Sequence, residues 1–210
     1  SINIGGSVTL IGDRAFYGCN TLTKAEFLPN TVTAIGEQAF AFCGRLSSAN
    51  LPNSLVTIGS EAFRACFALN AITIPESTTD IGDNAFLDCS SLQQVTFLTN
   101  QLSILPSGIF YQCKQLKEAL LPASVRRIKS SAFAYCESLS RVVLPEQLEA
   151  IGDDSFEYCK SLRAIDIPDS VVFIGASAFH SCSSLTDVKL PYGLRHLLNP
   201  AIAARVRFND

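Results

Sequence analysis

Cysteine has the richest chemistry of any residue in this 210-residue chain, and its eight copies recur at nearly constant spacing. They are Cys19, Cys43, Cys66, Cys89, Cys113, Cys136, Cys159 and Cys182. A zinc site needs thiols that converge from closely spaced pairs, and one Cys every 23 or 24 residues lacks that pattern. A disulfide between successive units is within reach by Cα distance, but parallel side chains seldom satisfy its dihedral angle. We therefore predict buried free thiols that pack as small hydrophobic groups.

Other residues with catalytic potential are few. The two histidines are His180 and His196. Equivalent units carry Tyr, Ala, Arg, Leu or Glu where His180 stands, so we predict an exposed side chain there; His196 lies in the C-terminal segment and indicates no site. Asp153 and Asp154 flank a variable corner and are interpreted as solvated charges. Since no G-x-S-x-G, P-loop or G-x-G-x-x-G motif is present, we predict no enzyme activity, cofactor, metal site or small-molecule substrate.

The composition agrees with a folded, non-catalytic chain. Hydrophobic residues make up 48% and charged residues 17%, enough apolar material for a continuous core. The apolar runs are too short for membrane insertion. The formal charge of −3, without long runs of one sign, argues against a nucleic-acid partner. The absence of Met suggests a mature piece or an excised segment.

These residues belong to an internal repeat that runs through the chain. Each cysteine follows a Phe by three residues and precedes a Leu by three, giving eight F-x-x-C-x-x-L units in steps of 23 or 24 residues. The phenylalanines are Phe16, Phe40, Phe63, Phe86, Phe110, Phe133, Phe156 and Phe179. A unit this short cannot bury its apolar residues alone, so we expect the units to stack and to bury them as ladders.

The rest of each unit predicts a short strand and a bend. An alternating triplet that ends before Pro, such as Ile72–Ile74 before Pro75, is typical of a half-buried strand. An Ile-Gly pair such as Ile58-Gly59 follows, and the glycine supplies either a positive φ or close packing. The stretch that leads into A-F-x-x-C has helical spacing and predicts one turn of α- or 3₁₀-helix.

The unit L-x-x-I-x-I-P-x-S-V-x-x-I-G-x-x-A-F-x-x-C resembles the BspA-like leucine-rich repeat over about residues 2–195. The resemblance implies an α/β leucine-rich-repeat solenoid, a horseshoe or straight rod with a parallel β-sheet on its concave face and about eight 23-residue repeats. It also implies a non-catalytic interaction or adhesion role, and it favours the cell surface or secretion while leaving an intracellular location open. Departures from the unit concentrate between residues 98 and 132, where a change of curvature or a contact site is expected.

We predict a single domain over residues 1–210, with repeats over 1–195 and a C-terminal cap over 196–210. The chain starts within a repeat, since Ile2 and Ile4 have the phase of a strand tail. Two interpretations of the cap are equally supported. Asn199-Pro200 could begin a short helix, or Val206 and Phe208 could form a last strand.

The outward positions of the strands suggest where a partner binds. Two rows point outward; the first is Lys24, Ser48, Ala71, Gln94, Glu118, Arg141, Ala164, Asp187 and the second is Glu26, Asn50, Thr73, Thr96, Leu120, Val143, Asp166, Lys189. Both rows are polar at their ends. In the middle, Leu120 and Val143 lie on neighbouring strands, bordered by Thr96, Glu118 and Arg141. An apolar spot with a polar rim predicts a protein-binding site, whereas stray exposed apolar residues are the plain alternative.

Two further hypotheses remain. The basic corner Arg126, Arg127 and Lys129, near Lys114 and Lys117, could meet an acidic partner, although a solvated edge is the simpler interpretation. For the whole chain, protein–protein recognition or cell-surface adhesion is the first expectation. A structural subunit of a larger assembly is the alternative.

Overall fold

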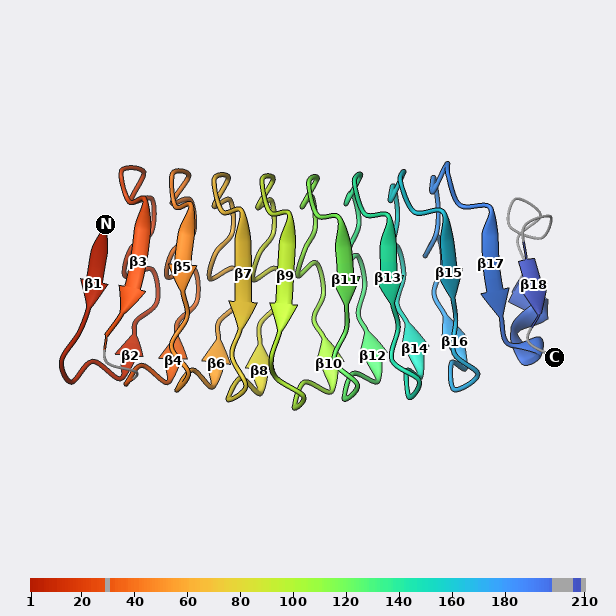
Figure 1. Ribbon diagram of the computed structural model, residues 1–210, viewed down its shortest axis with the longest axis horizontal. Coiled ribbons are helices and arrows are strands. Elements are labelled where there is room, and N and C mark those ends of the chain that lie inside the picture. The colour runs from red at the N-terminus through yellow and green to blue at the C-terminus, as the bar shows by residue number, and fades with distance from the viewer. Residues whose placement is uncertain (29–30, 198–205, 209–210) are drawn as a thin grey trace.

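The computed structural model describes residues 1–28, 31–197 and 206–208, and it shows a rod of stacked coils (Figure 1). Each unit makes one coil, with a longer strand on the front of the view and a two-residue strand behind its lower edge. The front strands are β1 (Ile2–Ile4), β3 (Lys24–Phe27), β5 (Ser48–Asn50), β7 (Ala71–Ile74), β9 (Gln94–Phe97), β11 (Glu118–Leu120), β13 (Arg141–Val143), β15 (Ala164–Asp166) and β17 (Asp187–Leu190). The short strands are β2 (Leu10–Ile11), β4 (Ala34–Ile35), β6 (Thr57–Ile58), β8 (Asp80–Ile81), β10 (Ile104–Leu105), β12 (Arg127–Ile128), β14 (Ala150–Ile151) and β16 (Phe173–Ile174).

All strand pairs are parallel and keep the phase of the repeat. Ile72 is paired with Val95, and Ile2 with Ala25, so the predicted strand tail at the start of the chain is confirmed. Hydrogen bonding divides the front strands into β1-β3-β5, β7-β9-β11-β13 and β15-β17-β18, and the short strands into β2-β4-β6-β8 and β10-β12-β14-β16. The front strands on either side of each interruption remain neighbours.

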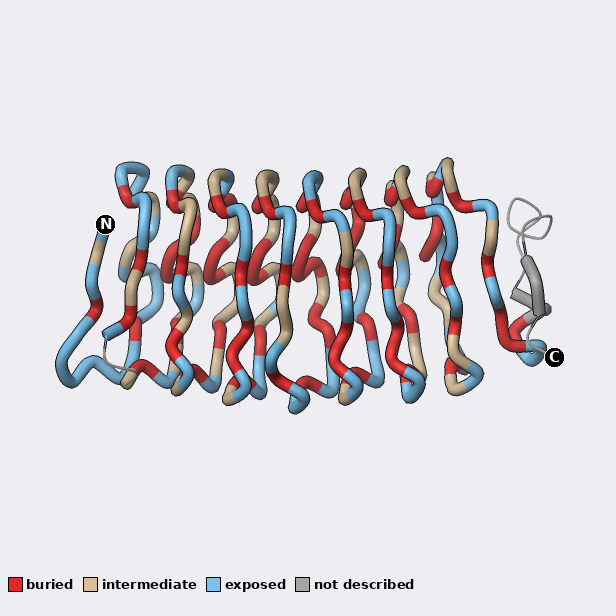
Figure 2. The backbone as a smooth tube through the Cα atoms, viewed as in Figure 1, coloured by how far each residue is buried: buried red, intermediate tan, exposed pale blue. Residues whose placement is uncertain are grey.

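The core is a file of stacked rings and thiols inside the coil. Six phenylalanines from Phe40 to Phe156 are fully buried, and their successive ring centroids lie 5.3–5.8 Å apart. The widest spacing separates Phe86 from Phe110, in one of the two 24-residue steps. The predicted solenoid is therefore confirmed: residues of one phase lie next to each other along a common axis (Figure 2).

The helical turn predicted ahead of each A-F-x-x-C segment is wrong. Two residues in each unit have positive φ, such as Glu61 at 54° and Ala65 at 55°, and a right-handed helix cannot include them. Their N–H groups donate to Asp83 O at 3.0 Å and Leu87 O at 2.8 Å in the next unit. The turns therefore form a third backbone ladder. Because η1 (Tyr192–Leu197), a 3₁₀-helix, is the only helix among the described residues, the α/β label is corrected to a nearly all-β solenoid.

Close packing, not backbone freedom, explains the glycine after the short strand. Neither Gly59 nor Gly82 has a positive φ. A Cβ on Gly59 would lie 2.6 Å from the carbonyl carbon of Gly36, and one on Gly82 would overlap Ser60 N. Pro106 replaces this glycine in one unit and has no N–H to donate. The row of short strands is interrupted at this place, between β8 and β10.

The C-terminal segment adds a strand to the front sheet. β18 (Val206–Phe208) pairs in parallel with β17, so the strand interpretation of the end is confirmed for the backbone. The alternative helix start at Asn199-Pro200 lies outside the described residues.

Candidate functional site

The front face is built by alternation. Along most front strands, buried residues alternate with exposed or half-buried ones, as the colours of Figure 2 show. On β11 and β13, Ala119 and Val142 point into the core, while Leu120 and Val143 point outward and are 47% and 42% exposed. Leu120 lies directly opposite Val143 in the strand pairing, so the two side chains form one apolar spot.

The predicted rim residues lie around this spot. Glu118 is opposite Arg141, and their side chains form an ion pair with 3.4 Å between Oε2 and Nη1. β9 joins β11 through Gln94 and Glu118, which places half-buried Thr96 beside the row that contains Leu120. The structure therefore brings all five predicted residues together on three adjacent strands.

A polar hollow of about 450 Å³ lies beside the apolar spot, where the same strands begin. It is lined by Gln93, Gln94, Lys117, Glu118, Ser140 and Arg141. Two amides, a hydroxyl, two cations and one carboxylate meet here, so the hollow has more hydrogen-bond donors than acceptors to offer an incoming group.

Leu98 was missing from the predicted site. It follows β9 in the place where most units have Pro, and it is 51% exposed. It lines a second hollow of about 310 Å³ together with Asn50 and Thr73, which places it on the front face. Its replacement of Pro was the available signal, because a large apolar residue at a corner has no core to fill.

The buried thiols do not form a reactive site. Seven cysteines are buried as predicted, whereas Cys19 in the first unit is exposed. Each buried thiol donates to the carbonyl of the preceding unit's Phe, as Cys113 Sγ does to Phe86 O at 3.3 Å. Burial raises the pKa of Cys43 to about 11, that of Cys182 to about 12, and that of Cys113 well above its usual value. A thiol held protonated is a poor nucleophile and a poor metal ligand. The role of the buried cysteines is therefore to pack in the core.

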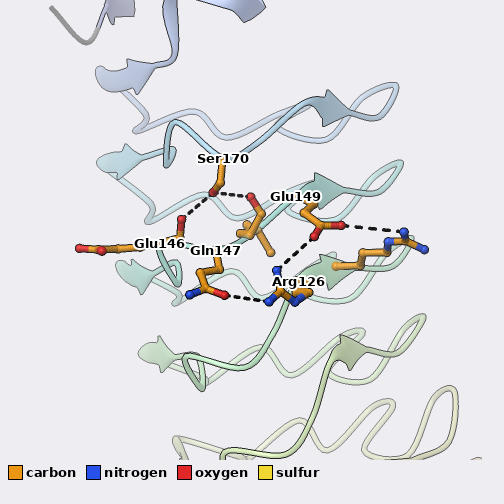
Figure 3. A network of polar contacts seen from close by, with 7 residues as sticks. Arg126, Glu146, Gln147, Glu149 and Ser170 are labelled. Carbon is orange, nitrogen blue, oxygen red and sulfur yellow. Dashed lines mark hydrogen bonds and ion pairs between the residues drawn. The ribbon is translucent and has the colours of Figure 1, made fainter.

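The basic corner is largely neutralised by its neighbours. Arg126 donates to Glu149 Oε1 at 3.2 Å and to Gln147 Oε1 at 2.8 Å, and Glu149 also approaches Arg127 (Figure 3). In the same network, the Ser170 hydroxyl donates to the backbone carbonyls of Glu146 and Leu148. The paired carboxylate favours the solvated-edge interpretation over an acidic partner at this corner.

Lys129, the third residue of the basic corner, and the other residues singled out from the sequence have different surroundings. Lys129 lies 3.8 Å from Asp83, whereas Lys117 lines the front-face hollow. His180 is exposed as predicted and makes an edge contact with the ring of Tyr158. His196 falls within η1, where its side chain lies outside the described part of the structure.

No helix among the described residues has the length and apolarity that crossing a membrane requires. No group of three or more His, Cys, Asp or Glu side chains among them is placed to hold a metal ion.

Stacked parallel coils, internal ladders and a variable outer face define a solenoid repeat protein. The chain matches the family model of the BspA type leucine rich repeat region, with six copies over residues 1–117 and 103–204, and it belongs to that family. Proteins of this repeat family are generally interaction or surface modules without enzyme activity. No curated protein sequence matches the chain.

Solved structures of bacterial repeat proteins resemble this chain. A leucine-rich repeat protein of T. pallidum has 29% identity and a TM-score of 0.70 over 89% of this chain and 78% of its own. One from Bacteroides ovatus has 25% identity and a TM-score of 0.56 over 99% and 82%. A leucine rich cell surface protein of Faecalibacterium prausnitzii shares the fold at 21% identity, with a TM-score of 0.50 over 98% and 77%.

Proposed function

We propose that the chain is a non-catalytic recognition module that binds a protein partner through its front face. The main support is the apolar spot of Leu120 and Val143, which are exposed at paired positions of β11 and β13. Thr96, Glu118 and Arg141 border this spot. Exposed apolar side chains inside a polar rim are typical of the centre of a protein interface. Membership of the repeat family supports the same role, and with it a cell-surface or secreted location.

The flatness of the face also supports a macromolecular partner. The front strands offer their outward side chains in regular rows, and the hollows among them are shallow depressions rather than enclosed cavities. A small ligand needs a concave pocket that covers most of its surface, whereas a polypeptide can lie across several strands.

The test is capture by the immobilised protein from an extract of its native source. The double variant Leu120→Asp/Val143→Asp should lose the captured partner, because two carboxylates would replace the apolar centre of the interface. The control Asn50→Asp/Thr73→Asp adds the same charges on β5 and β7 and should keep it. Circular dichroism should show all three proteins folded, because every substituted side chain faces outward. If the first variant still captures the same partner, the proposal is wrong.

A further inference from the structure

We propose that β11, β13 and β15 bind an acidic, apolar segment of the partner polypeptide, an inference that rests on the proposed function. Three cations gather where these strands begin. Lys117 and Arg163 have the same phase two units apart, and Arg141 lies on the strand between them. All three side chains belong to exposed residues, so they face an approaching partner.

The charges of this cluster are not balanced within the described structure. Arg141 is paired with Glu118 at 3.4 Å, whereas none of the described residues forms an ion pair with Lys117 or Arg163. Glu118 and Asp166 are the carboxylates on these three strands, so the strands and the residues just before them carry a net charge of +1, on a chain whose formal charge is −3. Free cations next to an exposed apolar spot favour an anionic partner, because complementary charge directs association and fixes the register of binding.

The geometry fits an extended peptide. Glu118 and Arg141 in the hollow precede Leu120 and Val143 by two residues on the same strands, a distance of about 7 Å along the strand. An extended peptide parallel to these strands has the same spacing between its residues i and i+2. An Asp or Glu side chain could therefore enter the 450 Å³ hollow while the residue two positions away covers the apolar spot.

The apolar spot favours a peptide over an acidic sugar chain. A uronate oligosaccharide would satisfy the cations, but it would leave Leu120 and Val143 with little apolar surface to cover them. Glu118 provides a further test, because its carboxylate competes with an incoming carboxylate for Arg141. Removing that charge should strengthen the binding of an acidic peptide.

The first experiment selects binders from a displayed library of random heptapeptides on the immobilised chain. We expect enrichment of peptides with Asp or Glu two positions from Leu, Ile, Val or Phe. Enrichment of basic or uncharged peptides, or of none, overturns the inference. If uncharged peptides are enriched and Leu120→Asp/Val143→Asp abolishes their binding, the proposed function stands and only the acidic partner is wrong.

The second experiment measures fluorescence polarisation with the best enriched acidic peptide, labelled with fluorescein. Lys117→Gln and Arg163→Gln should each weaken binding by about fivefold at low salt. Glu118→Gln should strengthen it, and the control Lys24→Gln on β3 should leave it unchanged. Weaker binding by Glu118→Gln contradicts the inference.

A sugar probe separates the two sources of carboxylate. Tetragalacturonate should bind with no measurable affinity. If it binds, and Lys117→Gln abolishes that binding while Leu120→Asp does not, the hollow is a glycan site and the peptide assignment is overturned.

Discussion

The interior of the coil and its front face follow opposite rules. Inside, every unit repeats the same Phe, Cys and Leu, and each residue packs against its copy in the next unit. On the front face, neighbouring units place Thr96, Leu120, Val143 and Asp166 at one equivalent position. The interior therefore fixes the shape of the solenoid, whereas the outward side chains of the front face differ from one unit to the next.

Among the variants that test this contrast, removal of an interior ring should have the largest effect on the free energy of unfolding. Phe86 is fully buried and stacks on Phe63 at 5.4 Å and Phe110 at 5.8 Å, whereas half-buried Phe16 has Phe40 as its stacking partner. Phe86→Ala should lower the free energy of unfolding by about 3–5 kcal/mol. Phe16→Ala should cost clearly less. Urea unfolding followed by circular dichroism checks both, and equal losses would mean that the stack is not the source of stability.

A smaller effect should come from the close approach of successive units. Gly82→Ala would put a Cβ against Ser60 N, so we expect a loss of about 1–3 kcal/mol. Gly12→Ala is the matched control, because nothing lies within 4 Å of its added Cβ and its φ is not positive. Thermal denaturation should leave the control at or above the wild-type midpoint. A similar drop in both variants would argue against close packing as the reason for the glycine.

The interior should also make stability depend on pH. Unfolded thiols ionise near their ordinary pKa of 9, while burial keeps Cys113 protonated to higher pH. The free energy of unfolding is therefore complete below pH 9 and falls as the pH rises above it. The slope is about 1.4 kcal/mol per pH unit for each buried thiol.

Two variants isolate this term in urea titrations at several pH values under reducing conditions. Cys113→Ala should reduce the slope by the contribution of one buried thiol, about 1.4 kcal/mol per pH unit. Cys19→Ala should leave it unchanged, since that side chain is exposed. A slope that follows the Cys19 substitution would contradict the assignment.

The smallest effect is expected on the exposed surface. Arg126→Ala removes an exposed ion pair with Glu149 and a hydrogen bond to Gln147, and should cost about 1 kcal/mol or less. The loss should shrink further in about 0.5–1 M salt, because salt screens the attraction between exposed charges. A loss as large as that of Phe86→Ala would mean that surface pairs, too, determine the shape.

The sequence predicted the interior because repetition removes ambiguity there. A single triplet such as Ile72–Ile74 predicts a strand only weakly. Because the triplet recurs at the same place in every unit, only one register lets all the units stack. The outward rows followed from the same alternation, which is why Leu120 and Val143 were found before the structure was known. Glu118 and Arg141 were found in the same way, although their ion pair was not predicted.

The sequence could not predict features that depend on backbone conformation between the strands. The left-handed turn residues include Arg14, Glu61 and Tyr135, which have no compositional signature of positive φ. They adopt it because their N–H groups bond to the next unit, a gain that exists only after stacking. Exposed Leu98 was missed for a related reason: it stands just past the alternating strand, where the pattern of burial no longer applies.

The hydrogen bonds between neighbouring coils join residues 21 to 27 positions apart, and this interval does not grow along the rod. Each coil closes a loop of about the same length as the previous one, so the entropy lost per closure stays constant. A longer array of such units would therefore gain surface without a higher average contact separation. The outer surface of this architecture can therefore be extended one unit at a time, and the entropy cost of each added unit is that of closing one coil.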